Sequence, residues 1–171
     1  MSHRIIPIKA FVHEVTSKPF IRLGSLDFGR KNIGVAVSDE TRITVTPYGS
    51  MHLRQPFRSV DNLIHLQSQL YEFSRSEGID YFVAGFPLTL EDKNMSPLCN
   101  HIMWILQNLP FNEGTDPRLT FCLWDETFST ARARQSIKST SMKRRVMMKH
   151  KDAVAAAHIL RNFVDCWIDV P

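Results

Sequence analysis

The stretch Leu-Asp-Phe-Gly-Arg-Lys-Asn-Ile-Gly-Val-Ala-Val-Ser-Asp, residues 26–39, decides the fold prediction. Residues 21–27 and 33–37 are rich in apolar and β-branched side chains, which is typical of strands. The glycine and polar residues between these two runs are typical of a tight turn. The sequence therefore predicts a β-hairpin with its turn near residues 30–32, and Asp27 ends the first strand of that hairpin.

Outward from the hairpin, the apolar pattern alternates between two periods. Short apolar runs predict three further strands, and apolar residues spaced three and four apart predict four helices. The predicted strands are 43–46, which we expect Pro47 to stop, 81–85 and 119–124, and the predicted helices are 60–75, 95–109, 130–138 and 152–167. This order predicts an α/β fold, in which a mixed sheet led by a hairpin has helices on its faces.

Length and composition favour one globular domain. The chain has 171 residues, of which 43% are hydrophobic and 22% charged, and single domains usually have roughly 100 to 200 residues. We divide it into an N-terminal extension, residues 1–20, and a single domain, residues 21–171. The lack of a long apolar run and of a cleavable leader predicts a cytoplasmic protein without membrane contact. Three cysteines without C-x-x-C spacing argue against a disulfide framework and a zinc site.

Basic residues concentrate in one segment, residues 127–151. It contains eight Lys or Arg residues and no Asp or Glu, while the rest of the chain has 13 basic and 17 acidic residues. Because each neutralised phosphate releases counterions, this excess favours a nucleic-acid partner over the alternative of a solvated helix and loop. The candidates for phosphate contact lie just before the last predicted helix and in the hairpin turn: Arg144, Arg145, Lys149, Lys151, Arg30 and Lys31.

Acidic residues occur at three ends of predicted elements. Asp27 ends the first strand, Asp125 and Glu126 follow the fifth, and Asp152 opens the last helix. Each has a structural alternative, as a turn former, a strand end or a helix N-cap. An α/β sheet can bring them into one cluster, and clustered carboxylates call for a cation. Hard oxygen ligands without Cys or His indicate Mg²⁺ or Mn²⁺, the ions of metal-assisted phosphodiester cleavage.

Four blocks of this sequence resemble the YqgF-type, RuvX-like family of RNase H-fold proteins, which are described as pre-16S rRNA nucleases and Holliday-junction-resolvase-like enzymes. Residues 26–39 resemble the first-strand signature of that family, L-D-x-G-x-K-x-I-G-V-A-x-S-D. The other three blocks resemble its V-V-G-L-P-L strand, its D-E-R-L-S-T segment and its D-A-x-A-A-x-I-L helix: residues 83–88, 123–130 and 151–160. The resemblance extends over residues 21–167, in the order and spacing of the family.

The resemblance implies a five-stranded RNase H-like sheet of order 3-2-1-4-5, with strand 2 antiparallel to its neighbours. It also implies a catalytic metal centre made by Asp27, Asp152 and the acid pair Asp125 and Glu126. Adjacent residues of a strand point to opposite faces, so both members of the pair cannot face the metal while the strand continues. The family pattern favours Glu126 as the metal ligand of the pair.

The chain departs from the family pattern at two loop positions. Arg30 stands where the family has a small Thr, and Thr127 stands where it has Arg after the acid pair. A cation has thus moved from one loop to the other. The N-terminal extension and the divergent residues 139–150 favour a eukaryotic member, for which an organelle is the alternative to the cytoplasm.

The leading functional prediction is a nuclease dependent on Mg²⁺ or Mn²⁺ that acts on structured nucleic acid, with ribosomal RNA precursor as the expected substrate. Cleavage of four-way DNA junctions is the alternative with the same chemistry and requires a dimer; the expected state is a monomer or a weak homodimer. A nucleic-acid-binding protein with an inactive metal site is the alternative from another class. Nucleotide binding as in the actin superfamily ranks lowest, because those proteins need two such domains to enclose ATP.

Overall fold

A six-stranded mixed sheet forms the centre of the computed structural model, which describes residues 3–54, 58–87, 97–110, 119–125 and 151–167. One strand, β3 (Asn32–Ser38), runs antiparallel to both of its neighbours, β2 and β4, whereas the neighbouring strands β2, β5, β6 and β1 run parallel to one another. The strands are β1 (His3–Ile5), β2 (Leu23–Phe28), β3 (Asn32–Ser38), β4 (Val45–His52), β5 (Tyr81–Phe86) and β6 (Leu119–Asp125), in the order β1-β6-β5-β2-β3-β4. The predicted order 3-2-1-4-5 and the antiparallel second strand are confirmed, because they correspond to β4-β3-β2-β5-β6.

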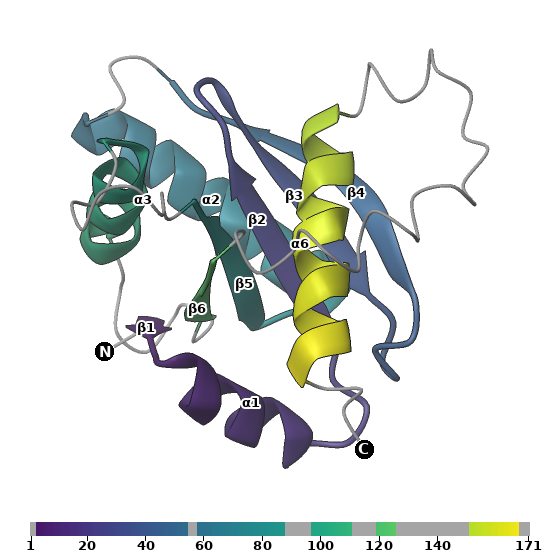
Figure 1. The fold of residues 1–171 in the computed structure, drawn as a ribbon. Coiled ribbons are helices and arrows are strands. Elements are labelled where there is room, and N and C mark those ends of the chain that lie inside the picture. Colours follow the sequence, from purple (N-terminus) through teal and green to yellow (C-terminus); the bar gives the residue numbers. More distant parts are fainter. Residues whose placement is uncertain (1–2, 55–57, 88–96, 111–118, 126–150, 168–171) are drawn as a thin grey trace.

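Helices cover both faces of this sheet, as predicted. The described helices are α1 (Ile8–Thr16), α2 (Val60–Glu77), α3 (Pro97–Asn108) and α6 (Lys151–Trp167). Figure 1 shows α6, in yellow, across β2 and β3 on one face, with α2 and α3 on the other. The helix predicted at 130–138 lies outside the described residues. None of the helices in the described part of the chain is long and apolar enough to cross a membrane.

Local chemistry decides where α2 begins and ends. The Ser59 side chain accepts a hydrogen bond from the Asn62 backbone N–H at 3.2 Å, which satisfies one of the free donors of the first turn. Gly78 ends the helix in the left-handed conformation, at φ 67°, where a residue with a Cβ atom is strained. The helix covers the face of the sheet opposite to α6, and its Gln69 side chain forms hydrogen bonds with the main chain of His52 at the end of β4.

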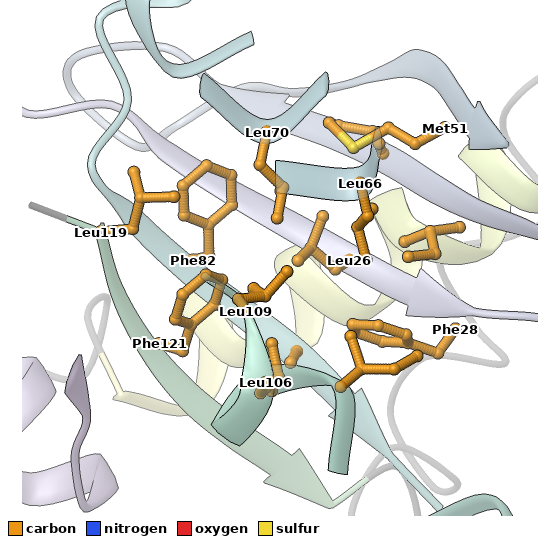
Figure 2. Packing of buried hydrophobic residues seen from close by; sticks show 14 of the residues in the cluster. Leu26, Phe28, Met51, Leu66, Leu70, Phe82, Leu106, Leu109, Leu119 and Phe121 are labelled. Atoms are coloured by element: carbon orange, nitrogen blue, oxygen red, sulfur yellow. The ribbon is translucent and has the colours of Figure 1, made fainter. Parts of the chain in front are cut away.

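Two apolar cores lie on the two faces of the sheet. The core under α2 and α3 includes Leu26 and the stacked rings of Phe82 and Phe121, whose centroids are 5.5 Å apart (Figure 2). The core under α6 and α1 includes Trp124 and Phe163, which meet edge to face. Successive residues of each strand alternate between these cores, and this alternation decides on which face each acidic side chain lies.

The N-terminal extension contributes a strand and a helix to the fold. The three-residue β1 pairs in parallel with β6, which explains why the sheet has one strand more than predicted. Phe11 and Val15 of α1 are fully buried in the core under α6. Arg4 of β1 forms an ion pair with Glu14 of α1 at 2.7 Å, and the Tyr81 hydroxyl donates to the same carboxylate. The division of the chain at residue 21 stays a prediction.

The third strand of the hairpin-led group is longer than predicted. β4 spans Val45–His52, so the prediction that Pro47 stops it is wrong. This strand lies at the edge of the sheet, where proline is tolerated because its missing N–H need not face a neighbour. The register shifts between Val35 and Ala36 of β3, which leaves Tyr48 as the extra residue of a bulge. Because β4 continues past Pro47 to His52, its end lies alongside the start of β3.

Candidate metal centre

Gly34 allows the start of α6 to lie directly on the sheet. A Cβ atom at this position would be 1.9 Å from the main-chain carbonyl oxygen of Asp152 and 2.3 Å from its carbon, so only glycine fits without moving the helix. One turn along, the buried Ser25 hydroxyl donates to the Ala156 carbonyl at 2.7 Å. Because Gly34 pairs with Asp27 in the hairpin, these contacts bring the start of α6 next to Asp27.

Asp27 and Asp152 form a pair of like-charged side chains on the α6 face of the sheet. Asp27 lies on this face because Leu23 points into the core under α6, whereas Leu26 and Phe28 point into the other core. Burial, and then the negative charge of Asp152, raise the pKa of the Asp27 carboxyl above its ordinary range. Within the described residues, no side chain donates a hydrogen bond to this carboxylate. A cation would relieve both the burial and the repulsion.

In the metal-free protein, Asp27 is expected to make stability depend on pH. Its folded-state pKa is raised above the ordinary value of 3.8, so the folded chain holds the proton more tightly than the unfolded chain. This contribution is complete below pH 3.8 and is lost as the pH rises through the folded-state pKa. Asp27→Asn removes the titration, so its advantage in unfolding free energy over the parent should be larger at pH 7 than at pH 3.5. The advantage at pH 7 should exceed the advantage at pH 3.5 by about 1.4 kcal/mol for every factor of ten by which the folded chain binds the Asp27 proton more tightly than the unfolded chain does.

Urea unfolding in EDTA at both pH values measures this difference. Glu40→Gln, which removes an exposed carboxyl in the turn after β3, is the control for a general change of charge. An Asp27→Asn advantage that is equal at the two pH values would contradict the raised pKa.

The donor set of this pair fits Mg²⁺ or Mn²⁺ in kind, although two carboxylates do not complete a site. Carboxylate oxygens are the ligands that hard divalent cations prefer. Within the described residues, no group of three His, Cys, Asp or Glu side chains lies close enough to hold a metal ion. The third predicted ligand, Glu126, lies outside these residues. The geometry therefore supports Asp27 and Asp152 as one side of a metal centre.

Asn32 and His52 extend the polar cluster away from the carboxylate pair. The Asn32 side-chain amide donates from Nδ2 to Oδ2 of Asp152 at 3.4 Å. Its oxygen, Oδ1, lies 3.0 Å from Nδ1 of His52. Asn32 opens β3 and His52 closes β4, and the two residues are paired in the sheet register. Four polar side chains, two acidic and two neutral or basic, thus follow one another along this end of the sheet.

Comparison with known proteins places the chain in a family. Residues 21–166 match the model of the family described as "RuvX: Holliday junction resolvase". The chain belongs to the RuvX family. It is 30% identical over 147 residues to a protein of Protochlamydia amoebophila named "Putative pre-16S rRNA nuclease", covering 84% of this chain and 93% of that protein. A protein of the same name from Anaplasma marginale is 32% identical over 144 residues, covering 84% of each chain.

The RuvX fold of this chain is similar to that of a solved RuvC structure. T. thermophilus RuvC in complex with a Holliday junction substrate superposes with a TM-score of 0.52 over 85% of this chain and 95% of that chain. The two sequences are only 8% identical, so this likeness concerns the fold alone. It confirms the RNase H-like, RuvC-like class of the mixed sheet.

Asp125, the first residue of the acid pair, lies at the end of β6, and Glu126 lies outside the described residues. β6 ends at Asp125, which pairs with Phe86 of β5. Trp124 points into the core under α6, whereas Leu123 packs against the core under α2 and α3. By alternation Asp125 lies on the α2 and α3 face, away from Asp27. The structure does not bring Asp125 to the carboxylate pair, and the roles assigned to Asp125 and Glu126 stay predictions.

Three of the six predicted phosphate-binding cations lie at the same end of the sheet as the carboxylates. Arg30 and Lys31 are exposed in the turn between β2 and β3, and Lys151 is exposed as the first residue of α6. The Lys31 carbonyl accepts a hydrogen bond from the Leu53 backbone N–H at 2.8 Å, which ties the turn to the end of β4. The other three predicted cations, Arg144, Arg145 and Lys149, lie outside the described residues.

Sequence reasoning misses Asn32 and His52 as members of the polar cluster. The sequence pattern assigns Asn32 to the turn and favours a surface or packing role for each histidine. The signal that would find them is the pairing of β3 with a β4 that continues through Pro47, because only this register brings His52 opposite Asn32.

Proposed function

We propose that this RuvX-family chain is a nuclease that depends on Mg²⁺ or Mn²⁺ and hydrolyses phosphodiester bonds in structured nucleic acid. The proposed substrate is a ribosomal RNA precursor, in accord with the names of the two relatives described above. The observation that carries the proposal is the pair of Asp27 and Asp152, in which burial and like charge raise the pKa of Asp27. Such a pair is costly without a cation, and carboxyl groups with perturbed pKa values occur often at functional sites.

In this proposal Asp27, Asp152 and Glu126 are the metal ligands and the catalytic residues. When bound, the metal would activate a water molecule and stabilise the leaving oxygen. Asp27 presents its carboxylate from the end of β2, and the contact of Gly34 with the α6 backbone sets its distance to Asp152. Asp125 stays a candidate for catalysis only if the chain beyond β6 turns it toward the α6 face.

Basic side chains around the carboxylates would hold the phosphates of the substrate. Arg30, Lys31 and Lys151 are exposed at the end of the sheet that carries Asp27 and Asp152. Arg144, Arg145 and Lys149 precede Lys151 in the sequence and would add to this contact. Contacts of this kind position the nucleic acid and make its binding sensitive to salt, but they do not read its sequence.

Cleavage of four-way DNA junctions is the second candidate function, because the matching family model is described as a Holliday junction resolvase. A junction has two-fold symmetry, so symmetric cleavage needs two active sites in one dimer. The oligomeric state, which we propose to be a monomer or a weak homodimer, therefore helps to distinguish the two candidate functions. A dimer that forms on a four-way junction would favour the second candidate.

The function is tested by incubating the purified chain with a pre-rRNA end fragment and with a four-way junction, each in Mg²⁺, in Mn²⁺ and in EDTA. We expect metal-dependent cleavage of the RNA fragment. Glu126→Gln should reduce the cleavage rate at least about 100-fold, because the loss of a residue that only supports a metal ligand already costs up to about 100-fold. Asp125→Asn should cleave at close to the parental rate, because alternation along β6 puts position 125 on the same face as Leu123, away from Asp27.

The outcomes separate the competing functions. Preferred cleavage of the junction would favour a resolvase, and binding without cleavage of either substrate would favour a nucleic-acid-binding protein. Loss of activity in Asp125→Asn with full activity in Glu126→Gln would reverse the assignment within the acid pair.

A further inference from the structure

We propose that Asn32 and His52 are positioning residues that hold the Asp152 carboxylate in place for metal binding. The inference rests on the proposed function, because it assumes that Asp152 is a metal ligand. Its basis is the continuous chain of hydrogen bonds from Asp152 through Asn32 to His52. In this proposal Asn32 acts through Asp152, and His52 acts through Asn32, so neither residue would be a metal ligand.

The direction of the hydrogen bonds gives His52 a specific task. A carboxylate only accepts hydrogen bonds, so Asn32 must turn its NH₂ group toward Asp152. The Asn32 carbonyl oxygen then faces His52 and needs a donor, which His52 provides as an Nδ1–H group. If the amide rotated by half a turn, its oxygen would face the Asp152 carboxylate and repel it. His52 therefore selects the one orientation in which Asn32 binds Asp152.

The Asp152 carboxylate needs such a partner because it lies beside a second acid. Asp152 and Asp27 lie close enough for their like charges to repel each other. A free side chain at the start of α6 would rotate away from Asp27 and lose the geometry of a shared ligand site. The distance from Asn32 Nδ2 to Asp152 Oδ2, 3.4 Å, is longer than the roughly 2.7 to 3.2 Å of a typical N–H···O hydrogen bond. Such bonds often tighten when the bound complex forms.

The backbone around His52 is held from both sides, although its side chain is exposed. Gln69 of α2 accepts from the His52 N–H at 3.0 Å and donates to the His52 carbonyl at 3.1 Å. These two bonds replace the neighbouring strand that an edge strand lacks. On the inner side, the next residue, Leu53, donates to the Lys31 carbonyl at 2.8 Å. His52 is thereby fixed opposite Asn32, as a positioning role requires.

Mn²⁺ affinity of the full chain tests this inference without any need for cleavage. Titration followed by electron paramagnetic resonance gives the dissociation constant for the parent and each variant. Asn32→Ala should weaken Mn²⁺ binding about 10- to 100-fold, the range for outer partners of metal ligands. His52→Ala should weaken it by a smaller factor, and His52→Asn should restore it, because the asparagine NH₂ can replace the Nδ1–H donor.

A double variant separates action through Asn32 from an independent effect. If His52 acts only through Asn32, Asn32→Ala with His52→Ala should bind Mn²⁺ as weakly as Asn32→Ala alone. His13→Ala, an exposed histidine on α1, is the control for loss of a surface imidazole. Melting temperatures in EDTA should be close to the parental value for all of these variants, so that a change in affinity does not reflect unfolding.

Each outcome has a defined meaning. Parental Mn²⁺ affinity in Asn32→Ala, together with weakened binding in Asp152→Asn, would overturn the positioning role and leave the proposed function intact. Additive effects in the double variant would overturn the relay from His52 through Asn32. Absence of Mn²⁺ binding by the parent itself would instead overturn the metal-dependent function, and the positioning role with it.

Discussion

Asp152→Asn should abolish metal-dependent cleavage and leave the fold intact. Asp152 is the second residue of α6, so it is a residue of the first turn and not the N-cap, and asparagine has about the same size and helix propensity there. The contact of α6 with Gly34 involves the Asp152 main chain and is kept in the variant. The substitution removes only the negative charge, and with it the repulsion of Asp27. We expect the cleavage rate to fall at least about 100-fold, with a metal-free melting temperature equal to or above that of the parent.

Thermal unfolding with and without Mn²⁺ provides the second measurement. A ligand at 100 times its dissociation constant stabilises a protein by about 2.7 kcal/mol, and Asp152→Asn should lose most of this gain. Asp165→Asn is a matched control on the same helix, because it removes an exposed carboxylate that pairs with Arg161 near the other end of α6. If Asp152→Asn cleaves as fast as the parent, Asp152 is a structural residue and the proposed metal centre is wrong.

Gly34→Ala should strongly destabilise the protein. The added Cβ would be 1.9 Å from a backbone carbonyl oxygen of α6, and backbone cannot rotate away as a flexible side chain can. Overpacking of a core commonly costs about 1 to 3 kcal/mol, and a clash with backbone belongs at or above the upper value. We therefore expect a loss of about 3 kcal/mol or more in the free energy of unfolding. Any folded variant should also bind Mn²⁺ weakly, since α6 must move away from Asp27.

Gly49→Ala is the matched control for this substitution. Gly49 lies on the neighbouring strand β4, opposite Val35 of β3, and a Cβ there would meet nothing within 4 Å. Urea unfolding should show a change within about 0.5 kcal/mol, as for surface substitutions in general. Equal stability of Gly34→Ala and the parent would contradict the packing of α6 on β3.

Much of the sheet could be predicted because its strands carry strong local signals. The hairpin from 23 to 38 combines two apolar, β-branched runs with a glycine-containing turn, and the structure forms it as β2 and β3. The helices predicted at 60–75 and 95–109 are found at Val60–Glu77 and Pro97–Asn108. The family resemblance supplied the strand order, which neither apolar period nor turn chemistry specifies.

One strand prediction, the end of β4 at Pro47, was wrong, and one strand, β1, was not predicted, for a shared physical reason. Pro47 in isolation indicates a strand end, and the three residues of β1 are too few to show a period. Both strands lie at the edges of the sheet, where one side has no neighbouring strand. Because β4 is an edge strand, Pro47 can lie in it without a backbone N–H. The residues of β1 form a strand because they pair with β6. Neither condition can be deduced from residues close in sequence.

The amino-acid sequence by itself determined the hairpin, the alternation of strands and helices, and the choice of Asp27 and Asp152 as acids at element ends. These features depend on local periodicity and on the chemistry of single residues. Only the tertiary structure decided that α6 meets Asp27 over Gly34, that Asp125 lies on the other face, and that His52 reaches Asp152 through Asn32. Such contacts depend on strand register and helix docking, which join residues far apart in the chain, and a change of one residue in register would reverse the face of every side chain.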